Sequence, residues 1–298
     1  MILFSSTSVI LSLTFLLIVL CHPRQCYSVS NMLVCNSCLC ELLFSLSMLS
    51  MALFTYMNDQ REQQIADHMC IFRGYLGYVT DALQNYSYAL QAIYRYTYVV
   101  HHQKRLYQTY RLQFLFILIV WIFCFLSALV LMLSEQIKYN LDNQICQLPL
   151  RKTLFKLYIG SCVYCLPLII IQFVYYKLIR YLRNISNNSG STTAIGIIQA
   201  QREMQVLKRI IVLVSILITN GFPYLVFWFI AFGTDPPLYH FRISFLFVDV
   251  SLVPVMIAMF KFNNNVKDIL LKSIANLMSR TTKSGPIASD QRTQQKTF

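Results

Sequence analysis

The chain has 298 residues, of which 56% are hydrophobic and only 12% are charged. A soluble domain usually carries roughly twice that charged fraction, so the composition excludes an ordinary soluble enzyme or binding domain. The net charge of +13 does not indicate nucleic acid, because basic residues of membrane proteins collect on the cytoplasmic side of the bilayer.

Long stretches without charge run through the chain. The 23 residues between Arg111 and Glu135 contain no charged side chain, and neither do the 25 between Arg209 and Asp235. About 20 apolar residues span a bilayer as a helix. The pattern predicts seven spans, at Ile2–Leu20, Met32–Met57, Met69–Val100, Phe114–Leu133, Phe155–Ile179, Leu207–Phe232 and Phe241–Phe260. We therefore expect an all-α fold, an integral membrane bundle of seven transmembrane helices that occupies residues 1–262.

The third span is the most polar of the seven. It contains Arg73, Asp81, Gln84, Asn85 and Gln91. Polar groups in hydrocarbon are costly, so a helix that faces lipid does not carry this load, whereas a helix shielded by its neighbours does. The sequence therefore predicts the third helix at the centre of the bundle.

The distribution of basic residues sets the orientation. With the N-terminus outside, the cytoplasmic segments hold 17 Lys and Arg against three acids, and the outer segments hold seven against six. A cleaved signal peptide in place of the first span would turn the basic face outward, which the positive-inside rule disfavours. We expect a multi-pass plasma-membrane protein with an extracellular N-terminus and a cytoplasmic C-terminus. Because the first span begins at Met1, the outer N-terminal segment is either very short or missing from this sequence.

The chain after the seventh span changes in character. Residues 263–278 are predicted to form a short C-terminal amphipathic helix on the inner leaflet, with Lys267 and Lys272 flanking the apolar face. That face comprises Val266, Ile269, Leu270, Ile274 and Leu277. Residues 279–298 are polar and are predicted to be a disordered cytoplasmic tail.

Acidic side chains inside membrane spans mark functional sites by default. Glu41, Gln84 and Asp249 are expected to meet midway down the bundle, either around Na⁺ or a proton or as a water-filled structural network without an ion. The sequence contains no Cys/His spacing typical of a metal site, no catalytic constellation and no glycine-rich phosphate loop. We therefore expect no enzymatic activity and no cofactor apart from such a sodium ion.

Several residues recur at spacings that are informative together. They are Cys70 and Arg95 at the two ends of the third span, Trp121 in the fourth, Cys146 in the loop after it, and Pro167 and Pro223 in the fifth and sixth. In order and spacing this set resembles the rhodopsin-like (class A) family of G-protein-coupled receptors, over nearly the whole chain. The resemblance implies a disulfide between Cys70 and Cys146. It also implies that Glu41 lies in a sodium-binding pocket, where the family usually has Asp.

The resemblance further implies an activation switch. Arg95 matches an arginine that an acid of the sixth helix holds inactive and that meets the G protein once released, and Glu203, 20 residues before Pro223, stands at the matching place. Tyr175, eight residues after Pro167, matches a tyrosine that stabilises the active state. An arginine at a helix end needs an acceptor, which Glu203 can supply, although lipid phosphate is an alternative partner.

The chain departs from the family at some of these motifs. Tyr94 replaces the acid before the arginine, and Gly221 stands at the position of the sixth-helix tryptophan. Of the seventh-helix motif only Pro254 remains. These departures leave open a receptor-fold protein that no longer signals and serves as a partner of other receptors or as a ligand trap.

Candidate ligand contacts lie in the outer half of the spans. Gly77 stands where receptors for biogenic amines have Asp, so an amine ligand is disfavoured, but Asp81, one turn deeper, is an alternative residue for that role. Arg73, near the outer mouth, is expected either to bind an anionic group such as a peptide carboxylate or to reach the interface. Phe222 is expected at the pocket floor. The seventh span has no lysine for a retinal Schiff base, so the chain does not read as an opsin.

The sequence therefore favours a receptor that transmits binding of an extracellular ligand, a peptide or small molecule, to a cytoplasmic heterotrimeric G protein. A seven-helix transporter or proton-linked carrier that uses Glu41, Asp81 and Asp249 is the alternative from another class. Transporters often show internal repeats, and no repeat relates the two halves of this chain.

Overall fold

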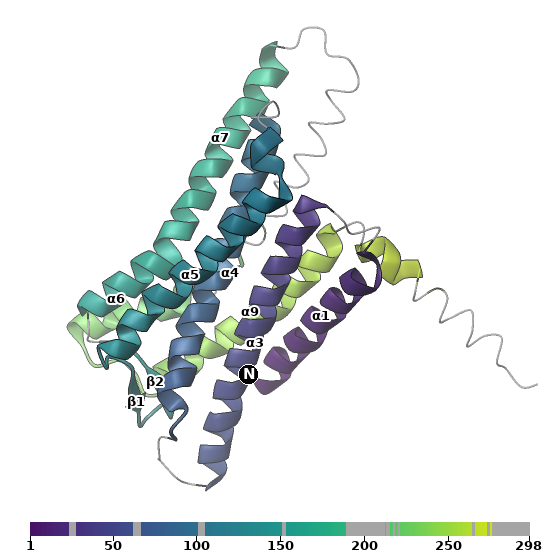
Figure 1. The fold of residues 1–298 in the computed structure, drawn as a ribbon. Helices are drawn as coiled ribbons and strands as arrows, with labels where there is room; N and C mark the ends of the chain where they lie inside the picture. The colour runs from purple at the N-terminus through teal and green to yellow at the C-terminus, as the bar shows by residue number, and fades with distance from the viewer. Residues whose placement is uncertain are drawn as a thin grey trace, which may run out of the picture.

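The computed structural model describes residues 1–23, 28–61, 67–100, 105–150, 153–188, 212, 215–216, 218–219, 221–263, 266–272 and 275. Its main helices are α1 (Ile2–Cys21), α3 (Val29–Arg61), α4 (Cys70–Val100), α5 (Tyr110–Leu133), α6 (Thr153–Ile159), α7 (Leu166–Asn188), Gly221–Gly233 and α9 (His240–Phe262) (Figure 1). A short 3₁₀ turn, η1 (Arg105–Gln108), precedes α5. The described helices follow the predicted spans in order, and the first part of the sixth span lies outside the described residues.

The helix α4 lies at the centre of the bundle. It packs against α3, α5 and α7, while α1 packs against α3 and α9 at the edge. Residues 82–92 of α4 form an unbroken buried run. The prediction of a shielded third helix is confirmed, and the shielding explains how this helix accommodates its amides and its acid.

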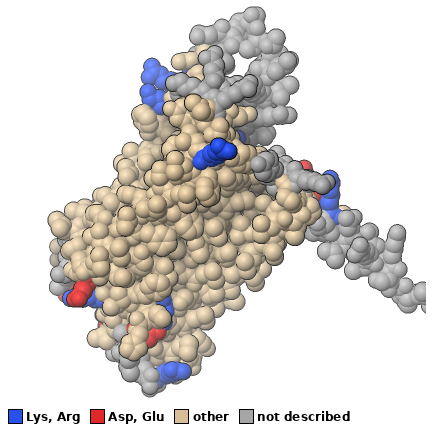
Figure 2. Space-filling model, in the orientation of Figure 1, with Lys and Arg blue, Asp and Glu red and all other residues tan. Residues whose placement is uncertain are grey.

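The remaining long helices present apolar side chains outward. Among the described residues, five helices are long and apolar enough to cross a membrane, and α5 is the most apolar of them. Its exposed side chains include Phe114, Ile119 and Leu126. Figure 2 shows the charged side chains of one face gathered toward the ends of the molecule, with an uncharged band between them. This arrangement is what a bilayer requires of a spanning bundle.

The fifth span is interrupted close to its proline. The π-helical segment η2 (Gly160–Cys165) separates α6 from α7, and Pro167 follows it by two residues. Proline has no N–H, so a carbonyl of the preceding turn loses its helical donor. The Tyr86 hydroxyl of α4 instead donates to the Cys162 carbonyl at 2.8 Å. The break is thereby tied to the central helix.

The loop between α5 and α6 folds as a β-hairpin that the sequence did not predict. Strand β1 (Lys138–Asn140) pairs antiparallel with β2 (Ile145–Gln147), with Tyr139 opposite Cys146. The hairpin lies over the end of the bundle at which α4 and α9 begin (Figure 1). We call this end the hairpin end.

Beyond α9 the structure describes a helical turn at residues 266–272. Asn263 ends α9, and its side-chain oxygen accepts a hydrogen bond from the Val266 N–H at 3.3 Å. Val266 and Ile269 are buried, and Lys267 and Lys272 are exposed. The predicted tail, residues 279–298, lies outside the described residues.

Candidate functional site

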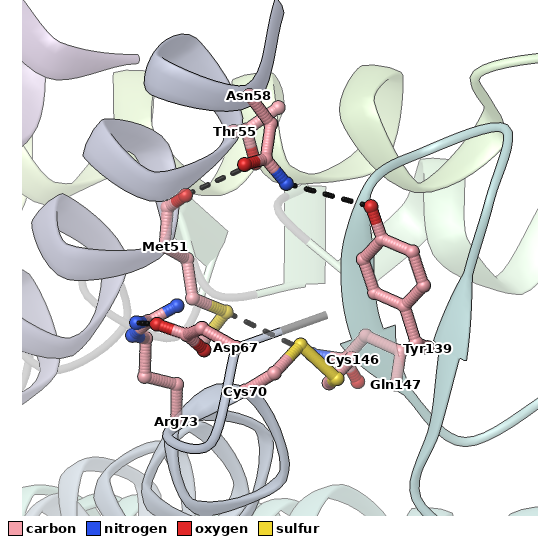
Figure 3. Close-up of a disulfide and its surroundings, with 9 residues drawn as sticks. All are labelled: Met51, Thr55, Asn58, Asp67, Cys70, Arg73, Tyr139, Cys146 and Gln147. Atoms are coloured by element: carbon pink, nitrogen blue, oxygen red, sulfur yellow. Dashed lines mark hydrogen bonds and ion pairs between the residues drawn. A yellow bond between two sulfur atoms is a disulfide. The ribbon is translucent and has the colours of Figure 1, made fainter. Parts of the chain in front are cut away.

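The hairpin is joined covalently to α4. Cys70, the first residue of α4, forms a disulfide with Cys146 of β2, with 5.5 Å between the two Cα atoms (Figure 3). At Gly74, one turn along α4, an added Cβ would lie 2.5 Å from the Cys146 carbonyl oxygen. Only glycine therefore lets the strand approach the helix this closely. The predicted disulfide is confirmed.

Polar contacts fasten the hairpin to two other helices. The Arg242 guanidinium of α9 donates to both carboxylate oxygens of Asp59 in α3, each at 2.9 Å, and to the Asn143 carbonyl at 3.2 Å. The Asn58 amide donates to the Tyr139 hydroxyl (Figure 3). Burial raises the pKa of the Tyr139 phenol. The sequence did not single out Arg242, because a basic residue near a span end usually marks only the interface.

Arg73 has its charge balanced within the chain. Its guanidinium forms an ion pair with Asp67 and lies 4.3 Å from the centroid of the Phe54 ring. Figure 3 shows this pair beside the disulfide. An anionic ligand at Arg73 would have to displace Asp67.

A buried polar cluster joins α3 and α4 in mid-membrane. Glu41 is completely buried, and its carboxylate accepts hydrogen bonds from the Gln84 amide and, at 3.4 Å, from the Tyr88 hydroxyl. Its second oxygen, Oε1, has no hydrogen-bond partner among the described residues. The structure thus brings Glu41 and Gln84 together, as expected from the sequence.

Asp249, the third member expected there, bonds to α1 instead. Its carboxylate accepts a hydrogen bond of 2.7 Å from Ser5. About one helical turn further along α1, Ser8 accepts a hydrogen bond of 2.8 Å from the Ser45 hydroxyl of α3. Ser5, Ser8 and Ser12 are all buried on one face of α1. This face was not predicted, although the spacing of three and four residues between the serines is the sequence signal that could have indicated it.

The predicted switch arginine lies at the end of α4 away from the hairpin. The Arg95 guanidinium donates to the Ser30 hydroxyl of α3 at 2.8 Å. Tyr94 is buried, and so is Tyr175, which packs in the cluster that joins α4, α7 and α9. Glu203, the predicted partner of Arg95, lies outside the described residues.

The candidate ligand contacts occupy different surroundings. Asp81 accepts hydrogen bonds from the Asn85 amide, at 3.2 Å, and from the Tyr164 hydroxyl of η2. An added Cβ at Gly77 would lie 2.7 Å from the Met51 methyl carbon, so α3 fills the space beside it. Phe222 is 61% exposed and therefore does not form a pocket floor here.

Gly221 occupies the position of the sixth-helix tryptophan, and the ring of Tyr164 lies in the space beside it. The Tyr164 ring lies 3.4 Å from where a Cβ at Gly221 would stand. Pro223 lies two residues further along, within the helix Gly221–Gly233. Pro254 lies inside α9.

A buried cation near the hairpin end was not singled out from the sequence. Lys156 of α6 is only 5% exposed, and its ammonium contacts the Tyr224 hydroxyl. The ammonium lies 4.5 Å from the Tyr224 ring centroid and 5.6 Å from that of Phe241. One lysine near the start of a span looks like an interfacial residue in sequence, so its burial was not predictable.

The fold and the disulfide-tied hairpin define a multi-pass membrane receptor of the seven-helix class. The family model "7 transmembrane receptor (rhodopsin family)" matches residues 14–260, and the chain belongs to that family. Squid rhodopsin, a solved structure, is similar with a TM-score of 0.75 and 18% identity, over 96% of this chain and 91% of that one. No curated protein sequence matches the chain. Family membership makes the protein a receptor rather than an enzyme.

Proposed function

We propose that the protein is a G-protein-coupled receptor whose hairpin end faces the outside and whose opposite end binds a heterotrimeric G protein. The observation that carries the proposal is the position of Arg95. It lies at the end away from the disulfide, and within the described residues its one hydrogen bond joins it to a serine hydroxyl. A neutral acceptor holds a guanidinium less firmly than a carboxylate does, so Arg95 is available to Glu203 or to carbonyl groups of a partner.

The proposed mechanism is a population shift. A ligand that binds the open arrangement more tightly than the closed one moves the equilibrium by its difference in affinity. In the open arrangement the Arg95–Glu203 contact is broken and the sixth helix has moved outward. The receptor itself performs no chemistry, and the exchanged nucleotide belongs to the G protein.

The proposal includes an orientation in the plasma membrane, with the N-terminus outside and the C-terminus in the cytoplasm. The excess of Lys and Arg in the segments opposite the hairpin end supports it. An epitope inserted in the hairpin turn, between Asp142 and Asn143, is expected to bind antibody on intact cells. An epitope after Phe298 is expected to bind only after permeabilisation, and the reverse pattern would refute the orientation.

The coupling test uses recruitment of each G-protein class in cells, without ligand and at matched surface delivery. We expect Glu203→Ala to raise recruitment, because Arg95 loses its restraint, and Arg95→Ala to lower it. A shift of about fivefold is typical of such coupling energies. If neither the wild type nor Glu203→Ala recruits any class, the non-signalling alternative is favoured over this proposal.

We also propose that the Glu41 cluster binds Na⁺. Sodium prefers oxygen ligands, and Glu41 Oε1 is a buried oxygen without a hydrogen bond in the described part of the chain. The Tyr88 hydroxyl, which donates to the other carboxylate oxygen at 3.4 Å, offers a further oxygen. No group of three His, Cys, Asp or Glu side chains occurs there among the described residues, so the donor set suits a singly charged ion better than a transition metal.

A further inference from the structure

Lys156 is enclosed by the bundle, and no acidic side chain of the described residues balances its charge. The side chain reaches from α6 toward the sixth helix and α9, where Tyr224 and Phe241 surround its ammonium. No ion pair joins Lys156 to any described acid, although Arg73 and Arg242 near the same end each have one. Taking an ammonium out of water is costly unless an anion accompanies it, and aromatic rings offset only part of that cost. The site is therefore short of one negative charge.

Within the described residues, the hairpin covers one side of the bundle mouth, and a hollow opens beside the sixth helix. On the covered side, Ile145 of β2 is buried among Met48, Met51 and Leu252, and it closes the mouth between α3 and α9. Along the outer part of the sixth helix, a hollow of about 440 Å³ is lined by residues that include Leu150, Trp228 and Phe232, together with Thr234 and Asp235. Trp228 lies one helical turn from Tyr224 and therefore on the same face of the sixth helix.

A hydrogen-bond donor without a partner in the described residues is buried beside the hollow. The Trp228 Nε1–H is buried and has no acceptor among the described residues. A buried donor without a partner is rare in proteins, so this indole N–H is available to an acceptor on a ligand. The acid that lines the hollow, Asp235, follows the helix end at Gly233, which is roughly 14 Å beyond Tyr224 by helix rise. The surroundings of Lys156 and Tyr224, which lie away from Asp235, thus favour an anion.

We propose that the ligand of this receptor carries an anionic oxygen group on an apolar or aromatic body, and that this group binds Lys156. The body would fill the hollow between Leu150, Trp228 and Phe232, with the indole N–H donating to the ligand. The inference rests on the proposed receptor function and adds the chemical class of the ligand. A free carboxylic acid and the phosphate of a lipid headgroup both supply such a group.

The test measures the Tm of the purified full-length chain in phosphatidylcholine nanodiscs. Phenylpropionate, indolepropionate and dodecanoate are each added beside the matching primary amide. We expect at least one acid to raise the Tm by about 2 °C or more above its amide. The effect is expected to vanish in Lys156→Met and to persist in Lys156→Arg and in Lys138→Met, an exposed lysine of β1.

A second arm replaces part of the phosphatidylcholine with phosphatidylglycerol and adds no acid. A Lys156-dependent rise in Tm in this arm supports the same site and assigns its anion to lipid. Without acid and in phosphatidylcholine, Lys156→Met is expected to raise the Tm, because it removes an unpaired buried charge.

Two results overturn the inference. One is a lower Tm for Lys156→Met in phosphatidylcholine alone, which would make Lys156 a structural residue. The other is that neither the acids nor phosphatidylglycerol shift the wild type in a Lys156-dependent way. Neither readout involves a G protein, so a failure of coupling and a failure of anion binding are distinguishable.

Discussion

Glu41 shows how a single residue constrains the middle of this bundle. Its carboxyl group is fully buried and is held by Gln84 and Tyr88 of the neighbouring helix α4. In a low-dielectric interior such bonds are strong, and an unsatisfied group is correspondingly costly. The cluster therefore joins α3 to α4, and within the described residues it leaves one carboxyl oxygen of Glu41 without a hydrogen bond.

We expect Gln84→Leu to destabilise the protein. The substitution removes a donor from the buried Glu41 carboxyl, which costs about 1–3 kcal/mol or more for a charged group. Thermal unfolding in detergent measures the loss as a lower Tm. Gln172→Leu, on the exposed face of α7, is the matched control and is expected to leave the Tm unchanged. The double variant Glu41→Leu/Gln84→Leu should lose less than Gln84→Leu alone, and a larger loss would contradict this account.

The sodium proposal makes a separate prediction at the same residue. Replacing sodium chloride with choline chloride is expected to lower the Tm of the wild type, because an ion that binds only the folded state stabilises it. Glu41→Gln is expected to make the Tm insensitive to the exchange, since the amide removes the negative charge. An equal sodium dependence in both proteins would place the ion elsewhere.

Substitution of Gly74 tests how much the close approach of the hairpin to α4 contributes to stability. We expect Gly74→Ala to cost about 1–3 kcal/mol of stability, because the new methyl group meets the Cys146 backbone at 2.5 Å. Gly160→Ala is the control, since nothing lies within 4 Å of an added Cβ there. Surface delivery and the Tm of the two variants should differ clearly, and similar values would show that the strand moves away easily.

At the scale of elements, the hydropathy of the sequence was sufficient to predict the helices. It was insufficient to predict the hairpin and the π-helical segment between them. The run of apolar residues in α5 predicted a span, and the polar load of α4 predicted a central position. The three-residue strands of the hairpin are too short to give a periodic pattern. The π-helical segment η2 depends on contacts with Tyr86, which lies far away in sequence.

The contacts of the candidate site could likewise be predicted only in part from the sequence. The Glu41–Gln84 contact was predictable because both side chains need a polar partner in mid-membrane. The bond from Ser5 to Asp249 was not predicted, since a serine in a span usually bonds its own helix backbone. The burial of Lys156 depends on how three helices meet, which a single sequence does not reveal.

We expect the stability of the hairpin to depend more on Arg242 than on Asp59, the ion-pair partner of Arg242. We expect Asp59→Ala to change stability by no more than about 1 kcal/mol, because the pair is partly exposed. Arg242→Ala is expected to cost more, since it also removes the bond to the Asn143 carbonyl. Chemical or thermal unfolding of the two variants measures the difference. Equal effects would show that the ion pair alone accounts for the role of Arg242.

At the scale of the whole molecule the two ends are built differently. The hairpin end is cross-linked by a disulfide, an ion pair and backbone contacts. At the opposite end, the one hydrogen bond that Arg95 forms within the described residues is to the Ser30 hydroxyl of α3. The proposed two-state receptor would bind its ligand at the cross-linked end and rearrange around Arg95 at the other.

The most direct measurement of this account is guanine-nucleotide exchange on purified G proteins by the purified receptor in nanodiscs. Wild type, Arg95→Ala and Arg111→Ala, an exposed arginine at the same end, are compared for each G-protein class. We expect accelerated exchange with at least one class, a loss of about fivefold or more in Arg95→Ala and little change in Arg111→Ala. Equal exchange by the wild type and Arg95→Ala with every class would contradict the proposal that Arg95 couples the receptor to its partner.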